Sequence, residues 1–194
     1  MKKKLFTVAF FIFSLAAFAQ EEVEEQKGFQ KEKLFVGGNF GLTFGNYTLI
    51  NVSPQLGYRF NNTLAAGMGI NGLYVSDKRY FNNGTPAYKT SQGVLGLNVF
   101  GRVYPIQQIL LQAQPELNYV FGKQTFYQPT QEFKLDAVIV PSLLMGGGLV
   151  IPSGGGAFMA TVFFDVLQKE RSPYGRRPIY NFGYNISLGG SRGQ

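Results

Sequence analysis

From Leu34 onward, apolar side chains recur at every second position of the chain. In the segment 111–121, for example, Leu117 and Tyr119 alternate with Glu116 and Asn118. A period of two is that of an extended strand with one apolar face, and the spacing of amphipathic helices is hard to find. The pattern predicts eight strands, at about residues 34–45, 50–60, 64–75, 95–104, 111–121, 134–150, 157–167 and 180–188.

The connections between these predicted strands alternate in length. We expect short turns and polar loops in turn along the chain, the turns at 61–62, 105–108 and 152–156 and the loops at 76–90, 122–132 and 168–178. The exception is the first connection on the loop side, at 45–47, which is short. Such alternation is typical of an up-and-down barrel whose short turns all face one compartment. The glycine run at 146–148 fits either the sixth strand or the turn after it.

The face opposite the apolar one carries mostly Gly, Asn, Ser, Thr and Gln, with only isolated charges. In a soluble sheet, that face would carry Lys, Glu and Asp instead. We therefore expect the apolar face to contact lipid and the small polar face to fill a narrow lumen. The predicted fold is all-β, an eight-stranded antiparallel up-and-down transmembrane β-barrel over residues 34–190.

Aromatic residues and prolines add detail to this prediction. Aromatic side chains near strand ends suit the membrane–water girdles of such barrels, and they include Tyr58, Phe60, Tyr74, Tyr104, Tyr119, Phe121 and Tyr180. Pro54, Pro115 and Pro141 each begin a Pro-x-Leu triplet on the apolar face. Because proline removes a donor from the sheet ladder, we expect local bulges at these three positions.

The first 19 residues have the features of a secretory signal peptide. Lys2, Lys3 and Lys4 precede an apolar stretch, and a small-x-small triplet ends at Ala19. The apolar stretch is shorter than the roughly 20 residues that a spanning helix needs, so we expect cleavage after Ala19. Cleavage removes three lysines and no acid, which lowers the formal net charge from +7 to +4. Residues 20–33 are charged and lack an apolar period, and we interpret them as a flexible lead-in.

Composition excludes several kinds of chemistry. The chain has no histidine and no cysteine, so it cannot form a histidine-based catalytic triad, a cysteine nucleophile, a Cys/His metal site or a disulfide framework. Its glycine-rich runs lack the Lys-Ser/Thr ending of a phosphate-binding loop. The modest, scattered positive charge of an exported chain does not favour a nucleic-acid partner. We therefore expect no enzyme activity, no cofactor and no metal site.

A few charged side chains fall on the face that is predicted to line the lumen, namely Arg59, Arg102, Glu116, Asp136 and Asp165. A lone charge in the lumen is costly, and neighbours of opposite sign offset that cost. We expect a network of ion pairs and hydrogen bonds that fills the barrel, in preference to a catalytic acid pair among the three acids. Folding the hairpin at 105–108 places Asn98 nearer to Glu116 than Arg102 is, so the pairing within the network stays open.

Basic and aromatic residues gather in the predicted loops. The candidates for external contacts are Lys78, Arg79, Tyr80, Arg176 and Arg177. Their cations could meet the phosphates of lipopolysaccharide, although solvated loop charge is the simpler interpretation.

The last predicted strand carries the most specific motif of the chain. Asn181, Gly183, Ile186 and Leu188 follow the polar-x-Gly-x-x-apolar-x-apolar pattern. This resembles the signal by which the barrel assembly machinery of Gram-negative bacteria recognises its substrates, although this chain continues to Gln194 where the family usually stops at an aromatic residue. Over residues 34–188 the chain resembles the small outer-membrane β-barrels of the OmpX and OmpA transmembrane-domain type. Its segments 154–158, 164–168 and 172–175 are similar to the C-terminal hairpin of uncharacterised outer-membrane barrels. The resemblance implies a place in the cell envelope, with outer-membrane lipid as a partner, and it implies no reaction.

Eight strands leave an interior just wide enough for the side chains of the barrel itself, which argues against a large pore. The leading hypothesis is a structural or surface-interaction protein whose outer loops contact lipid, lipopolysaccharide or an extracellular macromolecule. One alternative is a narrow channel or transporter for ions or very small solutes. Another is a soluble periplasmic barrel that binds an apolar ligand, as lipocalins do, in which case both faces are assigned backwards.

Overall fold

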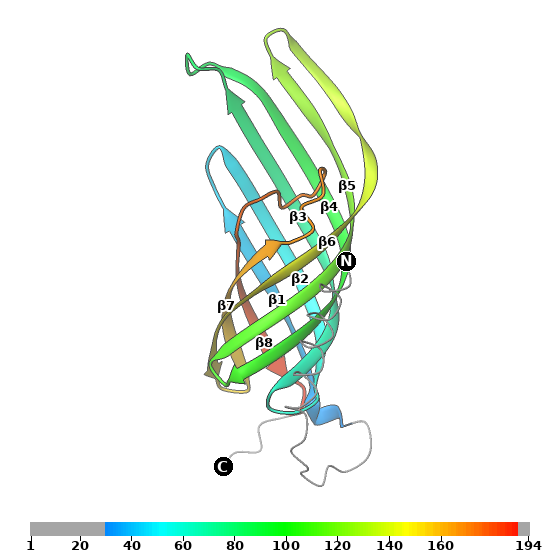
Figure 1. Cartoon of the computed structure of the whole chain (residues 1–194), viewed down its shortest axis with the longest axis vertical. Coiled ribbons are helices and arrows are strands. Elements are labelled where there is room, and N and C mark those ends of the chain that lie inside the picture. Colours follow the sequence, from blue (N-terminus) through cyan, green and yellow to red (C-terminus); the bar gives the residue numbers. More distant parts are fainter. Residues whose placement is uncertain (1–29, 190–194) are drawn as a thin grey trace, which may run out of the picture. The chain divides into compact units, whose positions relative to one another are not determined.

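The computed structural model describes residues 30–189, which form eight strands of one antiparallel sheet that closes into a ring (Figure 1). A single 3-10 turn, η1 (Lys31–Lys33), precedes the first strand. The strands are β1 (Leu34–Thr43), β2 (Tyr47–Arg59), β3 (Leu64–Tyr80), β4 (Pro86–Ile106), β5 (Ile109–Tyr127), β6 (Thr130–Ser153), β7 (Gly156–Asp165) and β8 (Ile179–Ser187). The predicted signal peptide and residues 20–29 of the predicted lead-in lie outside the described residues.

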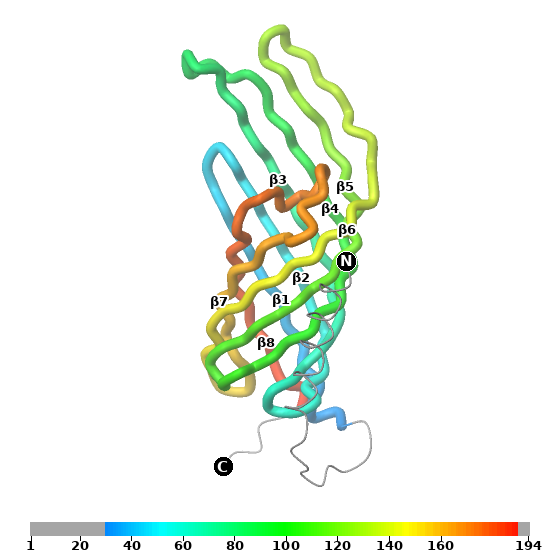
Figure 2. The backbone as a smooth tube through the Cα atoms, viewed as in Figure 1, coloured from blue at the N-terminus to red at the C-terminus, as the bar shows by residue number. Residues whose placement is uncertain are grey.

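The strands follow one another around the ring in chain order, and each is antiparallel to the next (Figure 2). The ring closes between β1 and β8, whose register runs from Phe35–Ser187 to Phe40–Phe182. This closing ladder is the shortest of the eight. The prediction of an all-β, eight-stranded antiparallel up-and-down barrel is confirmed, whereas its membrane location stays a prediction.

Away from the register shifts, successive residues of each strand point to opposite sides of the barrel wall. In β4, Leu97 is 67% exposed, whereas the next residue, Asn98, is 4% exposed. Phe40 and Leu117 also point outward, so the apolar face is the outer face, as the alternation predicted. Tyr104 differs from the prediction of an outer girdle position. It is buried, because it lies two residues after Arg102 on the same strand and therefore shares the inner face.

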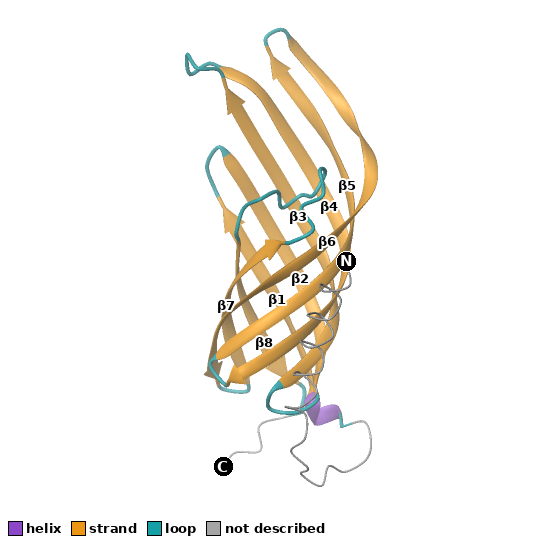
Figure 3. Ribbon diagram, viewed as in Figure 1, coloured by secondary structure: helices purple, strands orange, loops and turns teal. Residues whose placement is uncertain are grey.

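The two ends of the barrel carry different connections. One end, called here the short-turn end, holds η1, the end of β8 and the turns at 60–63, 107–108 and 154–155. The opposite end, called the hairpin end, holds the turns at 44–46, 81–85 and 128–129 and the longer loop 166–178. That loop, drawn in teal in Figure 3, agrees with the predicted loop at 168–178 and is called the capping loop below.

Four neighbouring strands continue past the others at the hairpin end. The strands β3 to β6 have 17, 21, 19 and 24 residues, and none of the other four exceeds 13. Their two hairpins stand above the rest of the barrel in Figure 1. The predicted loops at 76–90 and 122–132 are therefore wrong, since most of these residues are paired strand. The extensions are rich in polar residues and carry one aromatic cluster of Tyr88, Phe126 and Phe133. They therefore lack the regular apolar period that identified the rest of each strand.

The irregularities of the sheet lie away from the prolines. Pro54, Pro115 and Pro141 sit in strands whose register does not shift around them, so the bulges expected there are wrong. Pro54 pairs with Gly38 of β1, and only the ladder toward β3 skips its position, which limits the effect of the missing donor to one side. The register shifts lie instead at 79–80, 103–106 and 120–122.

The glycine run at 146–148 belongs to β6, where it pairs with β7. A Cβ atom on Gly146 would collide with the carbonyl oxygen of Val162, and one on Gly148 would collide with that of Ala160. These glycines therefore permit a close approach of two backbones. The turn that follows lies at Gly154–Gly155, where the positive φ of Gly154 (56°) suits a glycine.

Candidate functional site

Side chains fill the barrel interior in three layers. An apolar cluster at the short-turn end contains Phe35, Ala65, Phe100, Tyr104, Leu110, Val150 and Met159. A second apolar cluster at the hairpin end contains Leu49, Leu73, Val75, Val94, Val120, Val140, Leu144, Phe163, Tyr174 and Ile179. Buried polar side chains lie between them, and they include Asn39, Asn51, Ser53, Gln55, Asn71, Asn98, Arg102, Gln112, Gln114, Glu116, Asn118, Ser142, Thr161, Asp165 and Asn181. This polar layer is the candidate site.

Arg102 of β4 anchors the layer on its short-turn side. The register places it opposite Gln112 of β5, and its Nε donates to Gln112 Oε1 at 2.6 Å. Its Nη2 donates to Gln55 Oε1 of β2, also at 2.6 Å. The guanidinium lies 4.3 Å from the ring centroid of Phe100 and 5.7 Å from that of Phe35, within the range of cation–π attraction. Arg102 is therefore held by neutral amides and aromatic rings, at 1% exposure.

Alternate residues of β5 continue the hydrogen bonds toward the hairpin end. Gln112 Nε2 donates to Gln114 Oε1, and Gln114 Nε2 donates to Glu116 Oε1 at 2.7 Å. Asn118 Nδ2 donates to Glu116 Oε2 at 3.0 Å from the other side. Because these residues are spaced by two, all point into the barrel. Two glutamines thus separate the buried cation Arg102 from the buried anion Glu116, and a chain of hydrogen bonds joins them.

The capping loop folds back onto this chain. Tyr174 is buried in the apolar cluster of the hairpin end, and its hydroxyl donates to Glu116 Oε2 at 2.7 Å. Burial and the neighbouring Glu116 carboxylate hold the pKa of the Tyr174 hydroxyl well above its usual range, so the hydroxyl stays a donor.

Asp165, at the end of β7, fixes the start of the capping loop. Its Oδ1 accepts the N–H groups of Leu143 and Leu167, each at 3.1 Å. Its Oδ2 accepts the Ser172 hydroxyl at 2.6 Å. One carboxylate therefore ties β6, β7 and the capping loop together.

The five charged residues predicted for the lumen have different positions. Arg102, Glu116 and Asp165 are buried in the polar layer. Arg59 lies outside it, at the short-turn end, with its guanidinium 5.0 Å from the ring centroid of Tyr104. The structure corrects the prediction at Asp136, which is exposed. The register shift between Val138 and Leu135 of β6 inserts an extra residue there, which breaks the period of two.

Amides and one tyrosine complete the site, and no sequence motif marks them. Gln112, Gln114 and Asn118 alternate with Leu117 and its neighbours, which places them on the inner face, but only the register reveals that Arg102 lies opposite Gln112. No local pattern indicated that Tyr174 of the predicted loop 168–178 folds back into the barrel interior. A loop has no period, and its fold depends on contacts distant in the sequence.

The final strand places its motif residues on both faces. Asn181 is buried, and its Oδ1 accepts from Asn51 Nδ2 at 3.3 Å. Ile186 and Leu188 are 48% and 51% exposed. Gly183 of β8 pairs with Asn39 of β1, and a Cβ on Gly183 would clash with the Asn39 side chain. The motif therefore lies along the seam that closes the ring.

The predicted external contact residues lie at the hairpin end. Arg79 forms an exposed ion pair of 2.8 Å with Asp77, beside Lys78 and Tyr80 at the end of β3. Arg177 of the capping loop lies 4.3 Å from the ring centroid of Tyr47, which pairs with Asp77. Arg176 is exposed. A basic surface thus runs from the end of β3 to the capping loop.

Within residues 30–189, no group of three or more acidic side chains converges so that it could hold a metal ion. In the same part of the chain, no helix has the length and apolar character needed to cross a membrane. No protein-family model matches the chain, and no curated protein sequence is significantly similar to it.

Proposed function

We propose that this chain is an integral outer-membrane β-barrel with a side-chain-filled interior, which serves a structural or surface-interaction role at its hairpin end. The observation that carries the proposal is the apolar outer face, to which every strand contributes an exposed large side chain. From β1 to β8 these include Phe40, Val52, Ile70, Leu97, Leu117, Ile139, Phe164 and Phe182. Soluble monomers rarely expose continuous apolar patches above a few hundred Å².

The polar interior also supports a membrane location. Asparagine, glutamine and serine occupy the centre of the barrel together with the hydrogen-bonded charges of Arg102 and Glu116, which is where a soluble barrel would bury its apolar face. The strands have 9 to 24 residues, and about 9–11 residues cross a bilayer at a tilt near 45°. In this proposal, residues 1–19 are removed on export and the last strand is read by the assembly machinery.

The role assigned to the hairpin end follows from its geometry and charge. Two polar hairpins extend beyond the apolar belt, and the basic surface of Arg79, Arg176 and Arg177 lies beside them. Guanidinium groups bind phosphates well, so lipopolysaccharide is the partner that this charge favours. A large pore is disfavoured, since Arg102, Glu116 and Tyr174 cross the interior.

Cell fractionation with a gel-mobility assay tests the location. We expect the protein in the outer-membrane fraction, soluble only with detergent, and we expect its unboiled and boiled forms to migrate differently. Recovery in the soluble periplasmic fraction without detergent would overturn the proposal in favour of a soluble binder. Stepwise conductance in planar bilayers would favour the narrow channel, whereas a folded and silent protein fits the filled interior.

Binding to lipopolysaccharide vesicles tests the role. The double variant Arg176→Gln/Arg177→Gln should bind more weakly than the native barrel, and the deficit should shrink as salt is raised. Its matched control is Lys31→Gln/Lys33→Gln, which removes two cations at the short-turn end. Equal losses in both variants would point to non-specific attraction and would refute a site at the hairpin end.

A further inference from the structure

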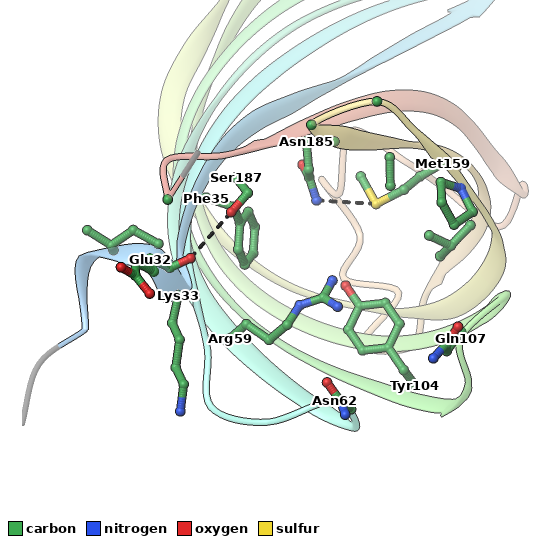
Figure 4. A pocket seen from close by; sticks show the side chains of 18 residues that line it. Glu32, Lys33, Phe35, Arg59, Asn62, Tyr104, Gln107, Met159, Asn185 and Ser187 are labelled. Carbon is green, nitrogen blue, oxygen red and sulfur yellow. Dashed lines mark hydrogen bonds between the residues drawn. The ribbon is translucent and has the colours of Figure 1, made fainter. Parts of the chain in front are cut away.

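The short-turn end contains a cavity of about 520 Å³ that opens at the mouth of the barrel (Figure 4). This volume lies within the range of roughly 300–1,000 Å³ in which proteins hold small organic ligands. Phe35, Val150 and Met159 give the cavity apolar walls. Arg59, Tyr104 and Asn185 supply its polar groups. The proposal made here depends on the barrel alone and does not require that it lies in a membrane.

Arg59 reaches across the cavity toward Tyr104 (Figure 4). Its guanidinium contacts the Tyr104 ring, and no carboxylate among residues 30–189 lies within ion-pair distance of it. A guanidinium has five N–H donors in a planar fork that matches a carboxylate. No group within residues 30–189 accepts a hydrogen bond from these donors, so they can bind a ligand that enters the cavity.

A second cation lies behind the cavity wall. Arg102 does not line the cavity, but its guanidinium lies 5.7 Å from the ring centroid of Phe35, which does, and Arg102 is 1% exposed. Among the described residues its Nη1 has no hydrogen-bond partner, and its other bonds go to the neutral amides of Gln55 and Gln112. Buried charges act at longer range than solvated ones, so the unneutralised Arg102 makes the cavity attractive to an anion.

Asn185 provides a further donor that is poorly used. Its Nδ2 contacts the thioether sulfur of Met159 at 3.4 Å, and both residues line the cavity (Figure 4). A thioether is a weak acceptor. A carboxylate or carbonyl oxygen in the cavity would be a better partner for this amide.

We propose that the cavity binds a small organic monoanion, with its carboxylate on Arg59 and its apolar body between Phe35, Tyr104 and Met159. A carboxylate fits better than a phosphate dianion for two reasons. Arg59 supplies the one guanidinium among the described lining residues. The ammonium of Lys33, the other lining cation, points away from the cavity and donates to the Phe60 carbonyl oxygen at 3.2 Å, and the neighbouring Glu32 carboxylate opposes a second negative charge (Figure 4). The aromatic walls favour a ligand with a flat or extended apolar body.

Titration of the ¹⁵N-labelled mature protein in a non-ionic detergent tests the proposal. The probes are benzoate, its neutral counterpart benzamide, and inorganic phosphate. We expect saturable benzoate binding, with NMR shift changes at the Arg59 side chain and at residues lining the cavity. Benzamide, which lacks the charge-assisted contact, and phosphate, which lacks the apolar body, should each bind at least about tenfold more weakly.

Variants assign the effect to the cavity. Arg59→Gln should weaken benzoate binding about tenfold, and Arg59→Lys, which keeps the charge and loses the fork, should fall between. Arg176→Gln removes an exposed arginine at the opposite end and should bind benzoate as the native protein does. The proposal is overturned if Arg59→Gln binds benzoate normally, if benzamide or phosphate binds as tightly as benzoate, or if none of the three probes binds. Should Arg59→Gln fail to fold, Arg59→Lys and the benzamide comparison still decide.

Discussion

The hydroxyl of Tyr174 donates a hydrogen bond of 2.7 Å to Oε2 of Glu116, which joins the capping loop to the middle of β5. Both oxygens of Glu116 accept donors, since Gln114 binds one and Asn118 and Tyr174 bind the other. A residue outside every strand therefore completes the polar layer of the interior.

Replacing Tyr174 with phenylalanine should lower the free energy of unfolding by about 1–3 kcal/mol, because a buried acceptor loses a donor while the ring still packs. Chemical denaturation measures the change. It is followed by far-UV circular dichroism, because the chain has no tryptophan for fluorescence. Tyr80→Phe, which alters an exposed tyrosine at the end of β3, is the control and should change stability by less than about 0.5 kcal/mol. Equal midpoints for the two variants would contradict the importance of the contact.

Arg102→Ala should also lower the unfolding midpoint in detergent. The variant leaves the amide oxygens of Gln55 and Gln112 without their donors, at roughly 1–3 kcal/mol for each unsatisfied group. Part of this loss is offset, because a buried charge disappears. Arg176→Ala, at an exposed position, should leave the midpoint unchanged. A midpoint for Arg102→Ala that matches the native value would refute the interior network.

Leu97→Arg distinguishes lipid from water at the outer face. In a bilayer, an arginine near the midplane costs about 2–4 kcal/mol. In water, the same substitution at a position that is 67% exposed should be nearly neutral. Refolding into lipid vesicles with urea titration measures the difference. Phe81→Arg at the tip of the β3–β4 hairpin serves as the control and should be tolerated in either case.

Gly148→Ala should reduce the yield of folded barrel and destabilise what folds by at least about 1–3 kcal/mol, since the new methyl group meets the carbonyl oxygen of Ala160. Gly101→Ala makes the same chemical change where no atom lies within 4 Å, and it should fold normally. Yields from parallel refolding reactions, read from the gel shift, compare the two. If both variants refold equally well, the close approach of β6 and β7 does not constrain the sequence.

Glu132 and Lys123 form an exposed ion pair of 2.8 Å near the tip of the β5–β6 hairpin. The Lys123 hydrogen bond lowers the pKa of Glu132, and the Glu132 hydrogen bond raises the pKa of Lys123. The contribution of Glu132 to the stability of the folded state is therefore present above its unfolded pKa and is lost as pH falls through the lowered folded pKa. The Lys123 contribution is present below the unfolded pKa of lysine and is lost as pH rises through the raised folded value.

Carboxyl ¹³C NMR titration checks this relation. Glu132 should titrate below the usual range for glutamate, and Lys123→Gln should move its midpoint upward. Global stability should hardly respond, because exposed ion pairs contribute little. An unchanged Glu132 midpoint in Lys123→Gln would show that the pair does not persist in solution.

The sequence predicted the parts of the fold in which one strand face is apolar. The alternation of apolar and polar residues, as around Leu97 and Leu117, predicted both the number of strands and which face of each strand is apolar. It failed beyond Val75 and Phe121, where polar residues dominate, the regular apolar period is lost and pairing depends on the neighbouring strand. It also failed at Asp136, because a single extra residue in β6 reverses the faces and leaves no signal in the composition.

The candidate site could be predicted only in part. Arg102, Glu116 and Asp165 could be predicted because they are among the few charged residues on a strand face that otherwise carries small polar side chains. The order in which Gln112 and Gln114 bridge Arg102 to Glu116 depends on side-chain reach across a curved interior, which a linear pattern does not contain. The locations in the outer membrane and at the lipopolysaccharide surface stay predictions until fractionation and binding are measured.

The seam between β1 and β8 has a consequence for how the molecule forms. Phe35 and Ser187 pair across nearly the whole length of the folded chain, so this ladder carries the greatest loop-closure entropy of any in the ring. It is also the shortest, and each of its few pairs must offset a larger share of that entropy. Contacts this distant in sequence slow folding. The eight strands, joined by six hairpin turns and the capping loop, can therefore assemble as an open, curved sheet before the ring closes. The first and last strands thus determine when the chain becomes a barrel.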